Sequence, residues 1–232
     1  MILGGLQKSS MIDYPGKVSC VCFLLGCNFD CPFCHNPYLV RRDLSKLDPM
    51  EEAEFYQFLE SRKGLLDGVV VSGGEPTLDR ELMTLCRRIK AMGYPVKVDT
   101  NGSRPEVIKS LMDEGLADYL AMDIKTDPSR YPLFIKQEFD PATLLRSIGM
   151  IMKWDGDYEF RTTCVKPLVN REVVENIART IEGAKRYALQ RFQDRDLLHP
   201  EFFQGVKPGY DEEEMSSLRS IAAPWVEQCV LR

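Results

Sequence analysis

Residues 18–36 read Val-Ser-Cys-Val-Cys-Phe-Leu-Leu-Gly-Cys-Asn-Phe-Asp-Cys-Pro-Phe-Cys-His-Asn. The apolar run Val18–Leu25 is typical of a buried strand, and it leads directly into a loop that carries Cys27, Cys31 and Cys34. Thiolates this close together hold soft metals, most often zinc or an iron–sulfur cluster. Three cysteines on a four-iron cluster leave one iron without a protein ligand. We therefore expect an open iron at which a small molecule binds and reacts.

Other interpretations of this loop use fewer of its residues. Ordinary buried thiols would not gather at such spacing in a loop that contains Pro and Asn. A zinc site with His35 as fourth ligand would use two sequence neighbours, whereas tetrahedral sites usually space their ligands apart. A c-type haem attachment at C-x-x-C-H, or a thioredoxin-like dithiol, would leave Cys27 without a role. The open iron–sulfur cluster uses all three cysteines.

Composition predicts an ordinary globular protein. The 232 residues are 44% hydrophobic and 28% charged, and we expect one domain over residues 1–232, with a barrel core at 17–193 and an irregular tail at 194–232. The formal charge is −5 and no long Lys/Arg block occurs, so we expect no nucleic-acid partner. The first residues lack the apolar core of a signal peptide, and no run approaches a membrane span. We expect a cytoplasmic protein without membrane contact.

Short β-branched runs alternate with helical patterns along the chain, as in βαβ units around a parallel sheet. Six strands are predicted, at 17–25, 68–72, 96–100, 119–124, 158–165 and 186–192. Five helices are predicted between them, one opening at Asp48-Pro49 with Glu51 in a capping box, and others at 79–92, 105–114, 141–153 and 171–182. The pattern favours an α/β fold with a partial (βα)6 parallel barrel. The tail holds an acidic helix start at 211–214 and an edge strand near 225–231.

Polar residues lie in or after the last part of each predicted strand, where parallel barrels gather their chemistry. Five further polar groups come after the cysteine loop: Gly73-Gly74-Glu75-Pro76, Asp99-Thr-Asn-Gly102, Asp123-Ile-Lys125, Arg161-Thr-Thr163 and Gln190-Arg-Phe-Gln193. Each group alone is also a plausible turn or surface ion pair. Together they predict a polar, charged pocket that faces the open iron.

This arrangement resembles the radical S-adenosylmethionine (SAM) enzymes. Their C-x3-C-x2-C loop, with an aromatic residue before the third cysteine, is matched by Cys27, Cys31, Phe33 and Cys34. The resemblance implies a [4Fe-4S] cluster whose fourth iron is chelated by SAM, and reductive cleavage of SAM to methionine and a 5′-deoxyadenosyl radical. It also implies that the Gly-Gly-Glu element, Gly73–Glu75, receives the methionyl ammonium.

Within that superfamily the chain is most similar to the glycyl-radical-enzyme activases. Cys34-His35-Asn36, Asp99–Gly102 and Asp123–Lys125 resemble that group. Segments 4–8, 12–16, 121–125 and 159–163 resemble, more narrowly, the activating protein of anaerobic ribonucleoside-triphosphate reductase. The resemblance implies a cofactor site that also includes His35, Asn36, Asp99, Asn101, Asp123, Lys125, Arg161 and Gln193. It further implies a monovalent alkali cation held by Asp99 and Asp123.

The implied reaction is hydrogen abstraction from a backbone glycine of a partner glycyl radical enzyme, with flavodoxin or ferredoxin as electron donor. The partner expected from the resemblance is anaerobic ribonucleoside-triphosphate reductase. Asp13 is expected to hydrogen-bond the partner's backbone, although Asp-Tyr-Pro-Gly also predicts a plain turn. The alternatives are an activase of pyruvate formate-lyase or another glycyl radical enzyme, a small-molecule enzyme such as 7-carboxy-7-deazaguanine synthase, and an iron–sulfur electron-transfer protein.

Overall fold

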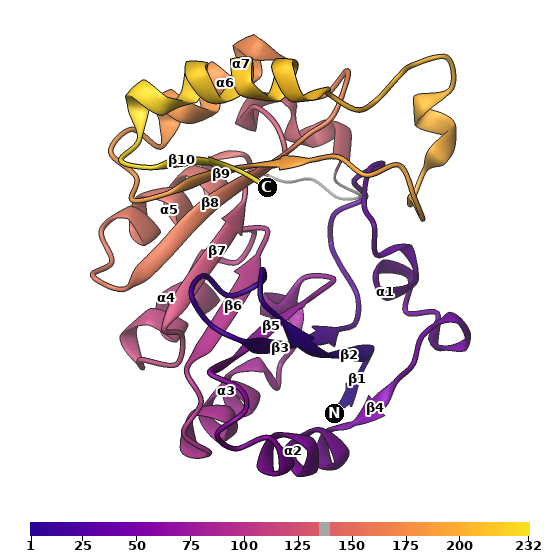
Figure 1. Cartoon of the computed structure of the whole chain (residues 1–232), viewed down its shortest axis with the longest axis vertical. Helices are drawn as coiled ribbons and strands as arrows, with labels where there is room; N and C mark the ends of the chain where they lie inside the picture. The colour runs from indigo at the N-terminus through magenta and orange to yellow at the C-terminus, as the bar shows by residue number, and fades with distance from the viewer. Residues whose placement is uncertain (135–139) are drawn as a thin grey trace. The chain divides into compact units, whose positions relative to one another are not determined.

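The computed structural model describes residues 1–134 and 140–232 and divides into two compact units. Unit 1 contains residues 1–28, 36–100 and 106–120, and unit 2 contains residues 29–35, 101–105 and 121–232. Each unit therefore combines segments that are far apart in the sequence. Figure 1 labels the helices and strands.

The strands of unit 1 form a mostly parallel arrangement. β3 (Ser19–Leu24), β5 (Gly68–Gly73) and β6 (Val96–Thr100) pair in parallel, and β2 (Gly5–Ser10) runs antiparallel beside β3. β1 (Ile2–Leu3) and β4 (Met50–Glu51) form a separate antiparallel pair. The sequence did not predict β2, whose residues are mostly exposed or half-buried and so lack the apolar run that marks its neighbours.

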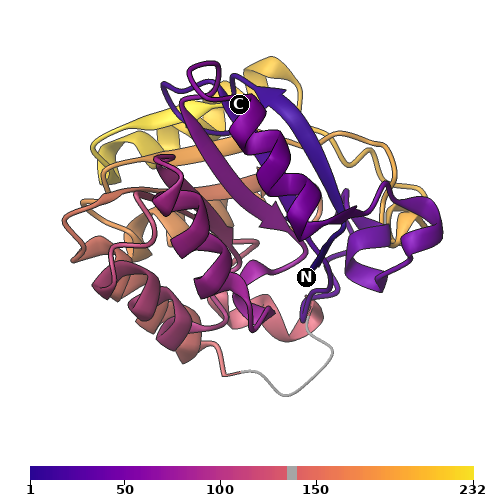
Figure 2. The same cartoon turned by 90° about the horizontal axis from the view of Figure 1, so that it is seen from below.

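Helices cover the strands of unit 1 and bury a continuous apolar core. These helices are α1 (Pro37–Arg41), α2 (Glu52–Ser61), α3 (Leu82–Ala91) and α4 (Pro105–Asp113), with short 3-10 turns η1 (Leu44–Lys46) and η2 (Pro76–Leu78). α2 and α3 lie along one side of β3 and β5 (Figure 1 and Figure 2). Val69, Val70 and Val71 are fully buried, because a parallel strand covered on both faces needs apolar side chains on both. Each such side chain contributes about 1.5–3 kcal/mol.

The predicted start of α2 is wrong. The helix begins at Glu52 rather than at Asp48-Pro49, and its N-cap is Glu51, which exchanges capping-box hydrogen bonds with Glu54. Met50 and Glu51 are held in an extended conformation by their pairing with β1, so the helix begins only after them. A strand of two residues leaves too little pattern to be predicted.

Unit 2 contains three parallel strands, β8 (Asp157–Cys164), β9 (Tyr187–Arg191) and β10 (Cys229–Leu231). β7 (Tyr119–Asp123) begins in unit 1 and ends in unit 2. The helical segments of unit 2 are η3 (Pro128–Phe134), α5 (Ala142–Met152), α6 (Arg171–Thr180), η4 (Pro200–Phe203), α7 (Glu212–Ala222) and η5 (Ala223–Trp225). Part of the long loop predicted before residue 141 lies outside the described residues.

The predicted α/β class is confirmed, and so are the six strands and the five helices between them, α2 to α6. The helix start predicted at 211–214 and the strand predicted near 225–231 are confirmed, and the tail is more regular than the sequence indicated. Asp211 and Glu214 cap α7 with a capping box, and β10 pairs in parallel with β9. Met215 and Leu218 of α7 are buried, with α7 lying beside α6 (Figure 1). The tail is therefore a structured part of unit 2. Within the described residues, we find no helix that is both long and apolar enough to cross a bilayer.

Candidate cluster and cofactor site

The cysteine loop begins where β3 ends, so the parallel strand fixes the position of its first residues. Gly26 adopts a positive φ of 85° and its N–H donates to Leu39 O at 2.8 Å. Cys27 lies in unit 1 and is half-buried, whereas Cys31 and Cys34 belong to unit 2. Phe33, which the sequence assigned to the cofactor site, is buried.

A segment from the predicted tail holds the unit 2 part of this loop through the backbone. Leu198 N–H donates to Cys34 O at 3.0 Å, and His199 N–H donates to Pro32 O at 3.2 Å. Arg195 O lies 3.1 Å from Nδ1 of His35. These contacts fix the carbonyls around Cys31 and Cys34. The sequence did not predict them.

The side chain of His199 adds a further contact to the same loop. Its Nε2 lies 3.1 Å from Oδ1 of Asp30, one residue before Cys31. Its Nδ1 lies 3.1 Å from Oε1 of Glu201. The carboxylates of Asp30 and Glu201 orient the imidazole. His199 therefore holds the cysteine loop at two points, at Pro32 through its backbone and at Asp30 through its side chain.

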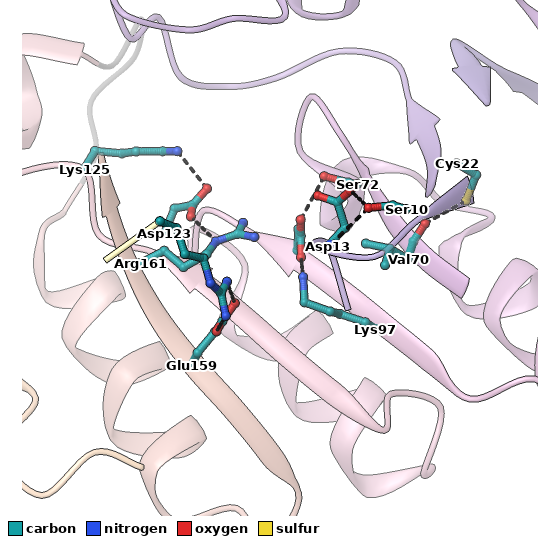
Figure 3. Close-up of polar contacts among 12 residues, drawn as sticks. Ser10, Asp13, Cys22, Val70, Ser72, Lys97, Asp123, Lys125, Glu159 and Arg161 are labelled. Carbon is teal, nitrogen blue, oxygen red and sulfur yellow. Dashed lines mark hydrogen bonds and ion pairs between the residues drawn. The ribbon is translucent and has the colours of Figure 1, made fainter. Parts of the chain in front are cut away.

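Three charged residues of the predicted site form one group in unit 2 (Figure 3). Lys125 Nζ lies 2.8 Å from Oδ2 of Asp123, and Arg161 Nε lies 2.7 Å from Oδ1 of the same carboxylate. Burial opposes ionisation of Asp123, but the charges of Arg161 and Lys125 outweigh it and hold the pKa of that carboxyl below its ordinary value. The group therefore keeps an anionic aspartate between two cations at neutral pH.

Lys125 also interacts electrostatically with the cysteine loop. Burial would lower the pKa of its ammonium, but the carboxylate of Asp123 and then the thiolate of Cys31 outweigh burial and raise that pKa. The ammonium of Lys125 therefore lies close enough to Cys31 for the two charges to interact. Thiolate is the form in which cysteine binds iron.

Tyr131, which the sequence did not single out, connects the same elements. Lys125 N–H donates to Tyr131 Oη at 2.6 Å, and the ring of Phe29 meets the Tyr131 ring edge-on at 5.8 Å. Phe29 belongs to the cysteine loop. Tyr131 thus connects the backbone of Lys125 with Phe29, the first residue of the cysteine loop that belongs to unit 2.

The Gly-Gly-Glu element lies against the start of the cysteine loop in unit 1. Gly74 N–H donates to Leu24 O at 2.9 Å, and Glu75 N–H donates to Gly26 O at 2.8 Å. A Cβ on Gly73 would lie 2.3 Å from Leu24 O, and one on Gly74 would lie 2.0 Å from Gly26 O. Only glycine allows this approach of two backbones. Asn36 Nδ2 donates to Gly73 O at 3.4 Å, so a second predicted residue joins the group.

The Glu75 side chain is 1% exposed and is held by two threonines. Its Oε1 accepts from Thr77 N–H at 3.0 Å, from the Thr77 hydroxyl, and from Thr100 Oγ1 at 2.8 Å. Three donors on one oxygen fix the orientation of the carboxylate. This is the arrangement expected of a group that must present charge in a set direction.

The remaining predicted residues are distributed over both units. Asp99 of unit 1 pairs with Lys97, and Asn101 of unit 2 accepts from Ser103 N–H at 2.9 Å through its Oδ1. His35 and Gln193 are exposed. Asp13 lies before β3, at the entrance of that strand, and its carboxylate accepts from the Ser10 hydroxyl in a local turn. Its predicted contact with a partner stays a prediction.

The residues predicted to bind metals do not form a site for a single ion within the part of the chain that the structure describes. Over residues 1–134 and 140–232, no group of three or more His, Cys, Asp or Glu side chains converges on a point suited to a single metal ion. A four-iron cluster binds each thiolate to a different iron, so the three cysteines need not converge on one point to hold it. Asp99 and Asp123 each bind cationic side chains already, and the predicted alkali cation finds no support in their surroundings.

The chain is similar to known proteins along its whole length. Residues 21–187 match the Radical SAM superfamily. A protein of Methanocaldococcus jannaschii, provisionally named a glycyl-radical enzyme activating enzyme, is 36% identical over 236 residues, which cover 100% of this chain and 95% of the relative. A pyruvate formate-lyase-activating enzyme of Listeria monocytogenes is 35% identical over 136 residues, 52% of this chain and 51% of that enzyme.

Solved structures share the fold. Streptococcus suis SuiB bound to S-adenosylmethionine superposes with a TM-score of 0.67 at 12% identity, covering 89% of this chain and 48% of SuiB, so this chain spans about half of that protein. Family membership implies a [4Fe-4S] cluster and SAM. The cysteine loop, the parallel strands that end beside it and the match over residues 21–187 lead to one conclusion: the chain belongs to the radical SAM superfamily, and it is homologous to glycyl-radical enzyme activating enzymes.

Proposed function

We propose that the protein is a radical SAM activase that abstracts a hydrogen atom from a backbone glycine of a partner glycyl radical enzyme. The observation that carries this proposal is the 36% identity to a relative so named, which extends over the whole chain and nearly the whole relative. A match confined to the cysteine loop would support only the superfamily.

The residues of the cysteine loop fit a [4Fe-4S] cluster. Cys27, Cys31 and Cys34 would hold it, and the ammonium of Lys125 would lie near the thiolate of Cys31. When bound and reduced by a flavodoxin or ferredoxin, the cluster supplies the electron that cleaves SAM to methionine and a 5′-deoxyadenosyl radical. Backbone contacts from Leu198 and His199 would keep the loop in place during binding and release of SAM.

Two groups of the chain would bind SAM itself. Glu75, oriented by Thr77 and Thr100, would accept from the methionyl ammonium together with backbone carbonyls of the Gly-Gly-Glu element. The pair Asp123–Lys125, braced by Arg161, would contact the remaining polar groups of SAM. Each group would restrict the orientation of the part of SAM that it binds, and reaction at a single carbon requires a defined orientation.

The hydrogen atom would pass from the glycine Cα to the 5′ carbon, leaving 5′-deoxyadenosine and a glycyl radical on the partner. The two amide groups that flank the glycine stabilise its radical, so transfer from a primary alkyl radical is favourable. The partner that the sequence favours is anaerobic ribonucleoside-triphosphate reductase, in the cytoplasm. Pyruvate formate-lyase is the second candidate, since an activase of that enzyme matches 52% of this chain.

Electron paramagnetic resonance on mixed proteins tests this proposal. The reconstituted and reduced protein is incubated anaerobically with SAM and with either the reductase or pyruvate formate-lyase. We expect a glycyl radical doublet on the reductase and none in the Cys31→Ala control. A doublet only on pyruvate formate-lyase would replace the partner. SAM cleavage without a doublet on either protein, but with turnover of a free metabolite, would contradict the activase function.

A further inference from the structure

A lysine side chain is fully buried in unit 1 beside Asp99. Lys97 is labelled in Figure 3. Its side-chain exposure is 0%, and its ammonium donates to Oδ1 of Asp99, whose side chain is 12% exposed. The two residues stand two positions apart on β6, and alternate residues of a strand face the same side. The charged pair therefore lies on one face of the strand, while Val96 and Val98 are fully buried on the other.

Other contacts fix the orientation of this pair. Oδ2 of Asp99 accepts from Ser72 Oγ at 3.1 Å, so a donor reaches each oxygen of the carboxylate. The Lys97 ammonium lies 5.9 Å from the centre of the Tyr119 ring, which presents its electron-rich face to the cation. Asp99 is consequently held at the end of β6 in one defined position.

Stability alone does not explain why a strand would bury an ion pair of this kind. Replacing both partners of such a pair by apolar residues is often neutral or stabilising, whereas removing only one partner leaves an uncompensated charge. The pair is therefore better explained by a need for a carboxylate at Asp99 and for a positive charge next to it. An alkali cation would provide the same charge at this carboxylate.

We propose that Lys97 supplies from the chain itself the positive charge expected of an alkali cation at Asp99, so that SAM binding requires no monovalent metal ion. Lys97 is then a positioning residue that acts through Asp99. Asp123, the other carboxylate expected to hold the cation, is balanced in the same way within unit 2 by Lys125 and Arg161. Both carboxylates therefore already have cationic partners of their own.

The inference rests on the proposed SAM site and is independent of which partner carries the glycine. Its first test uses the reconstituted wild-type protein. The dissociation constant of SAM is measured in potassium, sodium and choline chloride at equal ionic strength. We expect values that agree within about twofold. An affinity that falls about tenfold or more in choline, the loss expected for one charge-assisted contact, would overturn the proposal.

Substitutions at Lys97 then test its role directly. In Lys97→Met the SAM affinity should fall in choline chloride and recover when potassium or methylammonium is added, because either cation can replace the missing ammonium. The double variant Lys97→Met/Asp99→Asn should show no such recovery. The matched control is Lys109→Met, which removes an exposed lysine paired with Asp113 and should leave both affinity and cation response unchanged.

Two outcomes decide between this role and a merely structural one. If Lys97→Met binds SAM with wild-type affinity in choline, or is weakened without recovery in any cation, Lys97 does not substitute for a cation. If Lys97→Met fails to fold, Lys97→Arg retains a positive charge and should bind SAM independently of the salt; a potassium requirement in that variant would contradict the proposal. Failure of glycine activation with unchanged SAM binding would count only against the proposed function.

Discussion

The carboxylate of Glu75 has two tasks in this account, and two substitutions separate them. The side chain is 1% exposed, and three donors from Thr77 and Thr100 share its Oε1. Glu75→Gln keeps an oxygen for these donors and replaces the other oxygen by an amide N–H2 group. Glu75→Ala removes the acceptor altogether and leaves the donors buried without it.

The magnitudes follow from these contacts. Hydrogen bonds to a charged group contribute about 1.5–3 kcal/mol and neutral ones about 0.5–1.5, so Glu75→Gln should lower the free energy of unfolding by about 1–3 kcal/mol. Glu75→Ala should cost more, about 3–5 kcal/mol, because buried donors lose their partner. Loss of the methionyl ammonium contact should weaken SAM binding by about 10–150-fold in both variants.

The assay combines denaturant unfolding with SAM titration of the reconstituted protein. The matched control is Glu159→Gln, which neutralises another fully buried glutamate that is paired with Arg232. This control should lose stability and keep its SAM affinity. Wild-type SAM affinity in Glu75→Gln would refute the assignment of the ammonium to Glu75.

Three further predictions concern unit 2. His199→Ala should release iron to a chelator several-fold faster than wild type, because one contact to Asp30 of about 0.5–1.5 kcal/mol is lost; His199→Gln should restore retention, and equal loss in both variants would contradict the contact. Arg232→Met should leave the Glu159 carboxylate buried without its two hydrogen bonds of 2.7 and 2.8 Å. The free energy of unfolding, measured by denaturant titration, should fall by about 3–5 kcal/mol. An unchanged unfolding midpoint would show that the pair does not stabilise the fold to this extent. The pKa of Asp123 is lowered in the folded protein, because Arg161 and Lys125 outweigh burial. Its contribution to stability is therefore complete at neutral pH and declines as the pH falls below the ordinary aspartate pKa toward the folded value. Asp123→Asn should remove that decline from an acid-unfolding curve, and a curve identical to that of the wild type would refute this direction of the pKa shift.

Much of the fold was predictable because its strands are continuous apolar runs. Val69, Val70 and Val71 mark β5 without ambiguity, and the helix predicted at 171–182 is α6, where Asn170 accepts from Val173 N–H at 2.9 Å. The mostly exposed β2 carries no such signal. β2 forms because it pairs with the neighbouring β3, and the residues of β2 alone do not predict that pairing.

The site was predictable where motifs are local. Gly73 and Gly74 could be assigned because they form a contiguous Gly-Gly-Glu element after a predicted strand, and the structure brings them against Leu24 and Gly26. Contacts between distant segments gave no such signal: His35 and Arg195 are 160 positions apart. A partial signal for Lys97 did exist, because a lysine between two valines of a buried strand requires a counter-charge.

Hydrogen abstraction from a glycine of the partner can be followed with a deuterium label. The reduced, reconstituted protein is supplied with SAM and with a partner reductase labelled with deuterium at its glycine Cα positions, and the 5′-deoxyadenosine formed is analysed by mass spectrometry. We predict deuterium in the 5′-deoxyadenosine and no product in Cys27→Ala. A protein with a complete four-iron cluster that forms no 5′-deoxyadenosine, or forms it without deuterium, would contradict the account.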